Sequence, residues 1–137
     1  MKAARLVVAG LIEREGRLLV CRRRADDAYG LKWEFPGGKA EGEESPQAAL
    51  RRELAEELGL EAEIGEELAR YGYQYPGREP ILLIFYRVRA WKGEPQNRAF
   101  AEIRWESPER LGQYDFLEGD REFLRRLAGG APGLPGC

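Results

Sequence analysis

The segment from Ser45 to Gly59 constrains the fold most, because it carries both a helix start signal and a helix stop signal. Ser45 is a favoured N-cap residue, and proline is well tolerated at the first helical position, where Pro46 stands. No glycine or proline interrupts residues 47–58, and Gly59 supplies a C-terminal stop. The sequence therefore predicts one well-bounded helix in the middle of the chain.

This predicted helix has an apolar face with an acidic face beside it. At about 100° per residue, Glu53, Glu56 and Glu57 fall within one arc of about 100°. Leucines at one-turn spacing form the neighbouring stripe and are expected to face the core: Leu50, Leu54 and Leu58. Like charges at this spacing destabilise a helix by roughly 0.2–0.5 kcal/mol per pair. Either the acidic face is simply solvated, or a divalent cation compensates the repulsion.

Strand-like segments surround the helix. Apolar and β-branched residues predict strands over residues 5–13, 17–24, 61–75, 81–91 and 103–105. Glu15-Gly16 and Pro76-Gly77 are turn signals, and residues 33–38 (WEFPGG) must bend at their end. A second amphipathic helix is expected over residues 119–127. This order predicts a mixed α/β or α+β fold, with helices packed on a sheet.

Composition narrows the chemistry. The 137 residues contain no histidine, which excludes Ser-His-Asp triads and histidine metal sites and favours an all-oxygen metal site. The formal net charge of −2 argues against binding to a nucleic-acid polymer or a membrane surface. No segment approaches the ~20 apolar residues of a membrane span. Cys21 and Cys137 are interpreted as free thiols, which suits the cytoplasm. We expect one domain over residues 1–127 and a disordered Gly/Pro-rich tail over residues 128–137.

Residues 38–60, GKAEGEESPQAALRRELAEELGL, resemble the Nudix box, the signature of the Nudix hydrolase superfamily. The fixed positions of that pattern hold Gly38, Glu44, Arg52-Glu53-Leu54, Glu56-Glu57 and Gly59-Leu60. The preceding WEFPGG segment is similar to the MutT-like branch. The resemblance implies the Nudix fold, an α/β/α sandwich with a mixed central sheet.

The resemblance also implies roles for individual residues. Glu53, Glu56 and Glu57 would hold Mg²⁺, with Mn²⁺ as a possible substitute, and the carbonyl of Gly37 would join them. Glu53 would alternatively, or also, be the base that activates water, and Glu44 would assist from outside the helix. The structural residues of the box would be Gly38, Arg52 and Gly59, with Arg52 orienting a neighbouring glutamate.

Four residues outside the box are expected to bind substrate. Phe35 is placed to touch a base, although a core position is an equal alternative. Arg78 corresponds to a nucleotide-contacting arginine of the MutT-like branch. Arg23 belongs to a basic run, residues 22–24, of which one arginine is expected to meet phosphate. Asp120 corresponds to a base-reading position; as an ionised acceptor it suits an amino group such as cytosine N4, and the alternative is an N-cap of the last helix.

The sequence departs from the MutT-like pattern at two positions. Gly77 replaces an aspartate near the base, which puts recognition of guanine or 8-oxoguanine in question. Ala99 replaces a further loop glutamate, and Glu102 is the nearest acid that could take its place.

The resemblance implies Mg²⁺-dependent hydrolysis of nucleoside triphosphates to monophosphate and pyrophosphate, with a cytidine-type or oxidised-guanine substrate. The alternatives are a Nudix hydrolase of ADP-sugars or dinucleoside polyphosphates, and a non-catalytic nucleotide-binding Nudix module. The expected partner is a small nucleotide, bound by a monomer or a homodimer.

Overall fold

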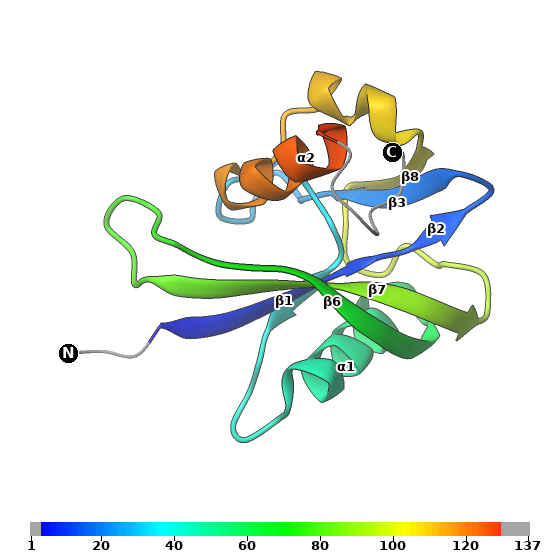
Figure 1. Cartoon of the computed structure of the whole chain (residues 1–137), viewed down its shortest axis with the longest axis horizontal. Helices are drawn as coiled ribbons and strands as arrows, with labels where there is room; N and C mark the ends of the chain where they lie inside the picture. The colour runs from blue at the N-terminus through cyan, green and yellow to red at the C-terminus, as the bar shows by residue number, and fades with distance from the viewer. Residues whose placement is uncertain (1–3, 130–137) are drawn as a thin grey trace.

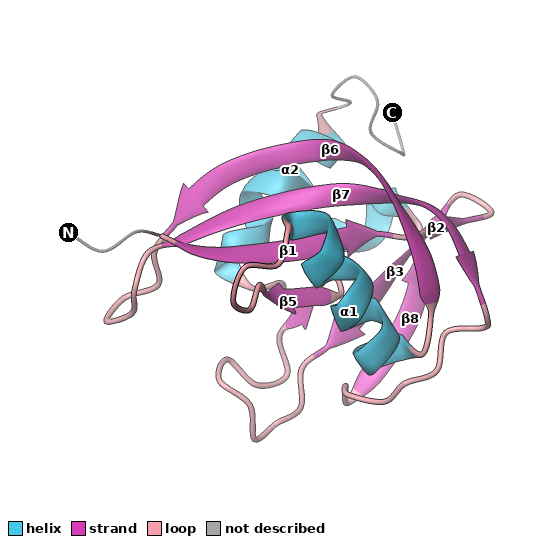
Figure 2. Ribbon diagram, turned by 90° about the horizontal axis from the view of Figure 1, so that it is seen from below, coloured by secondary structure: helices cyan, strands magenta, loops and turns pink. Residues whose placement is uncertain are grey.

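The computed structural model describes residues 4–129, and its central layer is a four-stranded mixed sheet. The strand order is β5-β1-β7-β6, and the bounds are β5 Gly37–Lys39, β1 Arg5–Leu11, β7 Ile81–Lys92 and β6 Glu61–Tyr73. β1 and β7 run parallel, whereas β5 and β6 pair antiparallel with their neighbours. The two longest strands, β6 and β7, are strongly curved (Figure 2).

A second, smaller sheet is antiparallel and lies beside the first. It consists of β2 (Glu13–Arg14), β3 (Arg17–Arg22), β4 (Trp33–Glu34) and β8 (Glu102–Glu106). β3 is its central strand, because β2, β4 and β8 all pair with it. The strand signals in the sequence did not reveal this division into two sheets.

Helices cover both faces of the mixed sheet, which confirms the predicted α/β/α arrangement. Helix α1 (Pro46–Leu58) lies on one face and helix α2 (Arg121–Ala128) on the other (Figures 1 and 2). Two short 3-10 helices, η1 (Pro108–Gln113) and η2 (Glu118–Asp120), precede α2. None of the helices within residues 4–129 has the length and apolar character needed to cross a bilayer.

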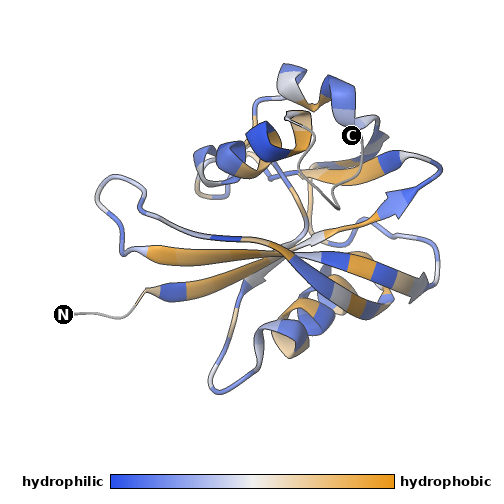
Figure 3. Ribbon diagram, viewed as in Figure 1, coloured by the Kyte–Doolittle hydropathy of each residue, from blue (hydrophilic) through white to orange (hydrophobic). Residues whose placement is uncertain are grey.

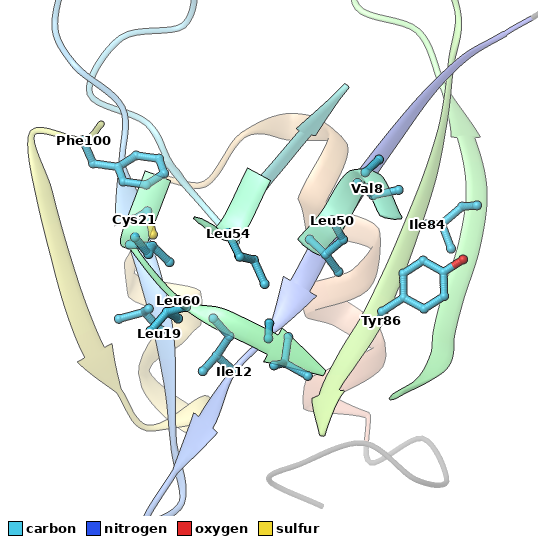
Figure 4. Close-up of a cluster of buried hydrophobic side chains, with 14 residues drawn as sticks. Val8, Ile12, Leu19, Cys21, Leu50, Leu54, Leu60, Ile84, Tyr86 and Phe100 are labelled. Carbon is cyan, nitrogen blue, oxygen red and sulfur yellow. The ribbon is translucent and has the colours of Figure 1, made fainter. Parts of the chain in front are cut away.

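Each helix closes a separate hydrophobic core, because successive residues of β7 point to opposite faces of the sheet. Ile84 and Tyr86 belong to the core under α1, together with the predicted leucine stripe of that helix. Phe85 belongs to the other core, where its ring stacks on Phe123 of α2 at a centroid distance of 4.2 Å. Figure 4 shows the leucines of α1 directed at the sheet, and Figure 3 shows the apolar bands along the strands.

Most predicted elements are confirmed, with shifted ends. The strand expected over residues 17–24 ends at Arg22, and the strand expected to reach residue 75 ends at Tyr73. The helix expected over residues 119–127 is divided, since η2 precedes α2, and η1 was not predicted. Ala128 ends α2, so the predicted tail overlaps the helix at this residue. The remainder of that tail from residue 130, including Cys137, lies outside the described residues; Cys21 is a buried free thiol.

Candidate functional site

Local sequence signals fix the helix that carries the candidate site. The Ser45 side chain accepts a hydrogen bond from the backbone N–H of Ala48, and Pro46 occupies the first turn. Gly59 adopts the left-handed conformation (φ 67°) that ends the helix. The leucine stripe is fully buried, so the direction of the acidic face follows from the packing of the apolar face.

The three glutamates of the box helix have different environments, and two of them, Glu53 and Glu57, lie against Gly37 and Gly38 of β5. The Glu53 side chain is 15% exposed, and the Glu56 side chain is 60% exposed. Glu57 is largely enclosed, and its Oε1 accepts a hydrogen bond of 3.2 Å from the backbone N–H of Gly37. A Cβ atom at Gly38 would lie 2.6 Å from Cδ of Glu53, so a larger residue at this position would displace the Glu53 carboxylate. The fold therefore brings the carboxylates of Glu53 and Glu57 onto the backbone of β5.

Arg52 joins the glutamates to one another, as the resemblance implied. Its guanidinium makes a bidentate ion pair with Glu44, through Nε at 2.7 Å and Nη2 at 3.0 Å. Nη1 donates to Glu53 at 2.9 Å and to Glu56 at 3.3 Å. Nη2 also donates to the carbonyl of Lys39. Arg52 thus positions carboxylates on the helix and on the loop before it.

The acids of the site have very different pKa values because their environments differ. The hydrogen bonds from Arg52 and from the Glu41 backbone lower the pKa of Glu44 to about 2. Burial, followed by the charges of Glu34 and Glu53, raises the pKa of Glu57 to about 9. None of the ion pairs among residues 4–129 involves Glu57. Glu57 is therefore a largely enclosed carboxyl group to which no other side chain of residues 4–129 supplies an ion pair.

The donor types at the box suit a hard divalent cation, since carboxylate and carbonyl oxygens are its preferred ligands. Within the described residues, however, no three acidic, cysteine or histidine side chains converge closely enough to hold a metal ion. Arg52 draws Glu53 and Glu56 towards itself, and Glu57 is turned to the Gly37 N–H. The residues fit the chemistry of the ion, and binding would require their side chains to rotate away from these partners.

Glu34 is a functional candidate that the sequence analysis missed. It is the middle residue of Trp33-Glu34-Phe35, and its side chain is only 16% exposed. Both carboxylate oxygens accept from Nη1 of Arg23 at 3.2 Å, and burial together with the charge of Asp120 raises the pKa of Glu34 to about 8, although Arg23 lowers it. Strand alternation was the available signal, because it places Glu34 on the opposite face from Trp33 and Phe35.

Phe35 and Asp120 come together, as their shared expected role required. Phe35 is 2% exposed, and its ring contacts the rings of Phe85, Phe116 and Phe123, so the residue contributes to the core. Its backbone N–H donates to Oδ2 of Asp120 at 3.2 Å. Phe35 thereby connects the end of β4 to the start of α2.

The alternative that Asp120 caps the last helix is wrong. The residue has helical backbone angles (φ −86°, ψ −11°), and its side chain makes no capping hydrogen bond. It is instead buried, 5% exposed, and its Oδ2 accepts the hydrogen bond from the Phe35 N–H. Burial raises its pKa to about 7, against the opposing effects of the Phe35 N–H and Arg23. At neutral pH this carboxyl group can therefore donate as well as accept, which revises the acceptor-only argument for cytosine.

The arginines expected near substrate are occupied by protein groups. Arg23 binds Glu34 and donates from Nε to the carbonyl of Ala28. Its neighbours Arg22 and Arg24 donate to the carbonyls of Leu31 and Ala99. Arg78, after β6, lies with Cζ 5.3 Å from the centroid of the Tyr29 ring. Glu102, the expected replacement for the missing loop glutamate, forms an exposed ion pair with Arg104.

Comparison with known proteins gives a consistent result. The NUDIX domain family matches residues 1–127. A CTP pyrophosphohydrolase of Escherichia coli is 41% identical over 118 residues, which cover 86% of this chain and 87% of that protein. An 8-oxo-dGTP diphosphatase of Haemophilus influenzae is 35% identical over 122 residues, covering 88% and 89%. The solution structure of the E. coli ORF135 protein superimposes with a TM-score of 0.83 at 38% identity, covering 95% and 94% of the two chains.

Proposed function

The chain belongs to the NUDIX family and is a Nudix hydrolase, and from this premise we propose that it hydrolyses nucleoside triphosphates to a nucleoside monophosphate and pyrophosphate. The observation that carries the proposal is the position of Glu53 and Glu57 against Gly37 and Gly38 of β5, with Glu56 joined to Glu53 through Arg52. The relatives also support the proposal, because two proteins that are 41% and 35% identical to this chain are named as a CTP pyrophosphohydrolase and an 8-oxo-dGTP diphosphatase.

Nudix hydrolases generally need a divalent metal ion, and we propose Mg²⁺ here, with Mn²⁺ as a substitute. Glu53, Glu56 and Glu57 would hold it together with the Gly37 carbonyl, and Glu44 would support them through Arg52. When bound, such an ion neutralises charge on phosphate oxygens and lowers the pKa of a coordinated water. Glu57 favours this assignment, since a cation would stabilise the ionised form of a largely enclosed carboxylate that makes no ion pair within residues 4–129.

The protein's own groups would supply the remaining parts of the reaction. Glu53 is a partly buried carboxylate that lies against Gly38 of β5, and it is our candidate for accepting a proton from the attacking water. Arg52 orients Glu53 by its hydrogen bond from Nη1. Arg23 would exchange part of its ion pair with Glu34 for a substrate phosphate.

We place the base near Asp120, with Phe35 supporting that residue and Arg78 at the edge of the site. Asp120 has one oxygen engaged by the Phe35 N–H, which leaves its second oxygen available for a base edge. The protonation state of Asp120 decides which base it suits, because an ionised carboxylate accepts from an amino group whereas a protonated one also donates. Cytidine-type and oxidised-guanine triphosphates are therefore both candidate substrates.

The test is release of pyrophosphate and nucleoside monophosphate from CTP, dCTP, dGTP and 8-oxo-dGTP, with ADP-ribose and diadenosine polyphosphates as competing substrates. We expect turnover of at least one triphosphate with Mg²⁺, loss of that turnover with a chelator, and recovery with Mg²⁺ or Mn²⁺. Turnover confined to ADP-ribose or diadenosine polyphosphates would overturn the substrate class. Tight nucleotide binding without cleavage of any compound would instead favour a binding module.

A further inference from the structure

The loop between β3 and β4 holds two side chains in an unusual backbone conformation. Tyr29 has a φ of 55° and Leu31 a φ of 66°, and within residues 4–129 the sole other non-glycine residue with positive φ is Glu15. Such a backbone conformation is unfavourable for residues with a Cβ and often occurs where a functional site requires it. Backbone hydrogen bonds hold the loop closed, including Leu31 N–H to the Arg23 carbonyl at 3.0 Å.

The same two residues are exposed although their side chains are large and hydrophobic. Tyr29 is 38% exposed and Leu31 is 42% exposed, and no other large hydrophobic side chain in the described residues reaches this class. An exposed apolar side chain held in such a conformation is a candidate binding group where it also lies beside a site.

Tyr29, unlike Leu31, lies in an aromatic cluster beside the expected base site. Its ring centroid is 4.7 Å from that of Tyr75, with 34° between the ring planes. Tyr75 in turn contacts Tyr73 at 4.8 Å. The guanidinium of Arg78 lies 5.3 Å from the Tyr29 ring, so the loop after β3 meets the loop after β6 at this point.

A hydrogen bond connects this cluster to the base-reading residue. The Tyr75 hydroxyl accepts from the backbone N–H of Gly119 at 2.9 Å, and Gly119 immediately precedes Asp120. Tyr71 donates to the Gly119 carbonyl at 2.6 Å. Tyr71 of β6 and Tyr75, which follows that strand, therefore position the segment that presents Asp120, and Tyr29 lies on the exposed side of Tyr75.

We infer that Tyr29 is a further base-binding residue, whose ring stacks on the nucleobase and covers the proposed base site beside Tyr75 and Asp120. The inference rests on the proposed function, because it assigns a contact to the same nucleotide. With centroids 4.7 Å apart, the Tyr29 and Tyr75 rings are in direct contact, so a flat base can enter between them only if one ring moves. We expect the base to displace the exposed Tyr29 ring, which then packs on the outer face of the base.

This role predicts how Tyr29 and Asp120 divide recognition. Stacking on an aromatic ring is sequence-tolerant, because every base has a π face. Tyr29 should therefore strengthen binding of all bases to a similar extent. Asp120 acts on the base edge through a hydrogen bond and discriminates among bases.

The experiment measures binding of CMP, dGMP and base-free ribose 5-phosphate in the presence of Mg²⁺ by calorimetry, alongside KM and kcat for the corresponding triphosphates. The variants are Y29A, Y29F and L31A. Leu31→Ala is the matched control, since Leu31 lies on the same loop with the same sign of φ but makes none of the ring contacts. All three variants retain a Cβ, so the backbone cost of the loop is comparable.

We expect Y29A to weaken CMP and dGMP about 5- to 100-fold and to raise KM similarly with a smaller change in kcat, as for loss of one base–aromatic stack. Y29F and L31A should remain within about twofold of the unchanged protein, and ribose 5-phosphate should bind all variants alike. Equal loss for ribose 5-phosphate and CMP would overturn the inference, since it would mean general damage to the loop. Unchanged CMP and dGMP binding in Y29A would also overturn it.

These outcomes separate this inference from the proposed function. If the unchanged protein cleaves triphosphates and Y29A behaves identically, only the role of Tyr29 is wrong. If the unchanged protein cleaves no triphosphate and binds neither CMP nor dGMP, both proposals fall. If it binds both with the predicted Y29A loss but cleaves none, the base contact stands and hydrolysis does not.

Discussion

The box helix and the base site differ in how the chain builds them. The box site comes from one continuous segment, residues 37–57, in which Arg52 binds Glu44, Glu53 and Glu56. The base site comes from four separate places, represented by Tyr29, Phe35, Tyr75 and Asp120. A local segment can be recognised by its spacing, whereas an assembled wall depends on how the whole sheet folds.

The two regions also differ in how they treat buried charge. At the box, Arg52 offsets several carboxylates and leaves Glu57 without a cationic partner. At the base site, Asp120 is stabilised chiefly by a backbone N–H, and Arg23 acts on it only through its charge. We therefore expect substitutions at the box to affect mainly turnover. Substitutions at the base site should affect mainly the selectivity among bases and the pH dependence of stability.

The largest effect is expected for Glu57→Gln. The change is nearly isosteric and keeps an oxygen that can accept the Gly37 N–H, but it removes the carboxylate proposed to bind the metal. Turnover should fall by about a hundredfold or more, as for loss of a principal charge-stabilising group. Stability should be unchanged or higher, because a buried carboxyl with a raised pKa is lost. Pyrophosphate release and urea unfolding measure the two effects.

Glu63→Gln is the matched control for that prediction, since it makes the same chemical change at an exposed position on β6. The turnover of this variant should stay within about twofold of that of the unchanged protein. Full activity of Glu57→Gln would remove the metal assignment at the box, and equal losses in both variants would point to a general sensitivity of the fold.

The second effect tests the central position of Arg52. Arg52→Gln leaves Glu44, Glu53 and Glu56 without their shared cation, and the free energy of unfolding should fall by about 2 kcal/mol. Arg51→Gln changes the neighbouring exposed residue and should stay within about 0.5 kcal/mol. Urea unfolding in the absence of metal compares the two, and equal losses would mean that Arg52 has no special place in the box.

The third prediction concerns the base site. Asp120→Asn should change the ratio of kcat/KM between cytidine and guanine triphosphates by about tenfold, while maximal rates change less, because a base-edge contact is worth about 1–3 kcal/mol. The amide still accepts from the Phe35 N–H, so the fold of the site is retained. Steady-state kinetics on CTP and dGTP decide the matter, and an unchanged ratio would remove Asp120 from base recognition.

The smallest effect expected is a change in the pH dependence of stability. Burial raises the pKa of Asp120 to about 7 from its ordinary value of 3.8. Its contribution to stability is therefore fully present below about pH 4 and is lost as the pH rises towards 7. Asp120→Asn should become more stable relative to the unchanged protein between pH 4.5 and 7.5, by on the order of 1 kcal/mol or more. Urea unfolding at several pH values would contradict this if the two curves stayed parallel.

The sequence by itself determined the box helix and its orientation. Ser45 and Gly59 bound the helix through their own backbone preferences, and the leucine stripe placed the glutamates beside the core. These are local effects, because capping and helical periodicity act over a few residues. The Nudix-box spacing added the family, and the α/β/α architecture followed from it.

Only the tertiary structure decided how distant residues meet. It divided the strands into two sheets, put the carboxylate of Asp120 on the Phe35 N–H rather than on a helix end, and placed Tyr29 on Tyr75. It also showed that Glu34 is only 16% exposed and is electrostatically coupled both to Asp120 and to Glu57. This is because burial, pKa and ring contacts depend on which segments pack together, and that packing joins distant residues such as Phe35 and Asp120, which are 85 positions apart in the chain.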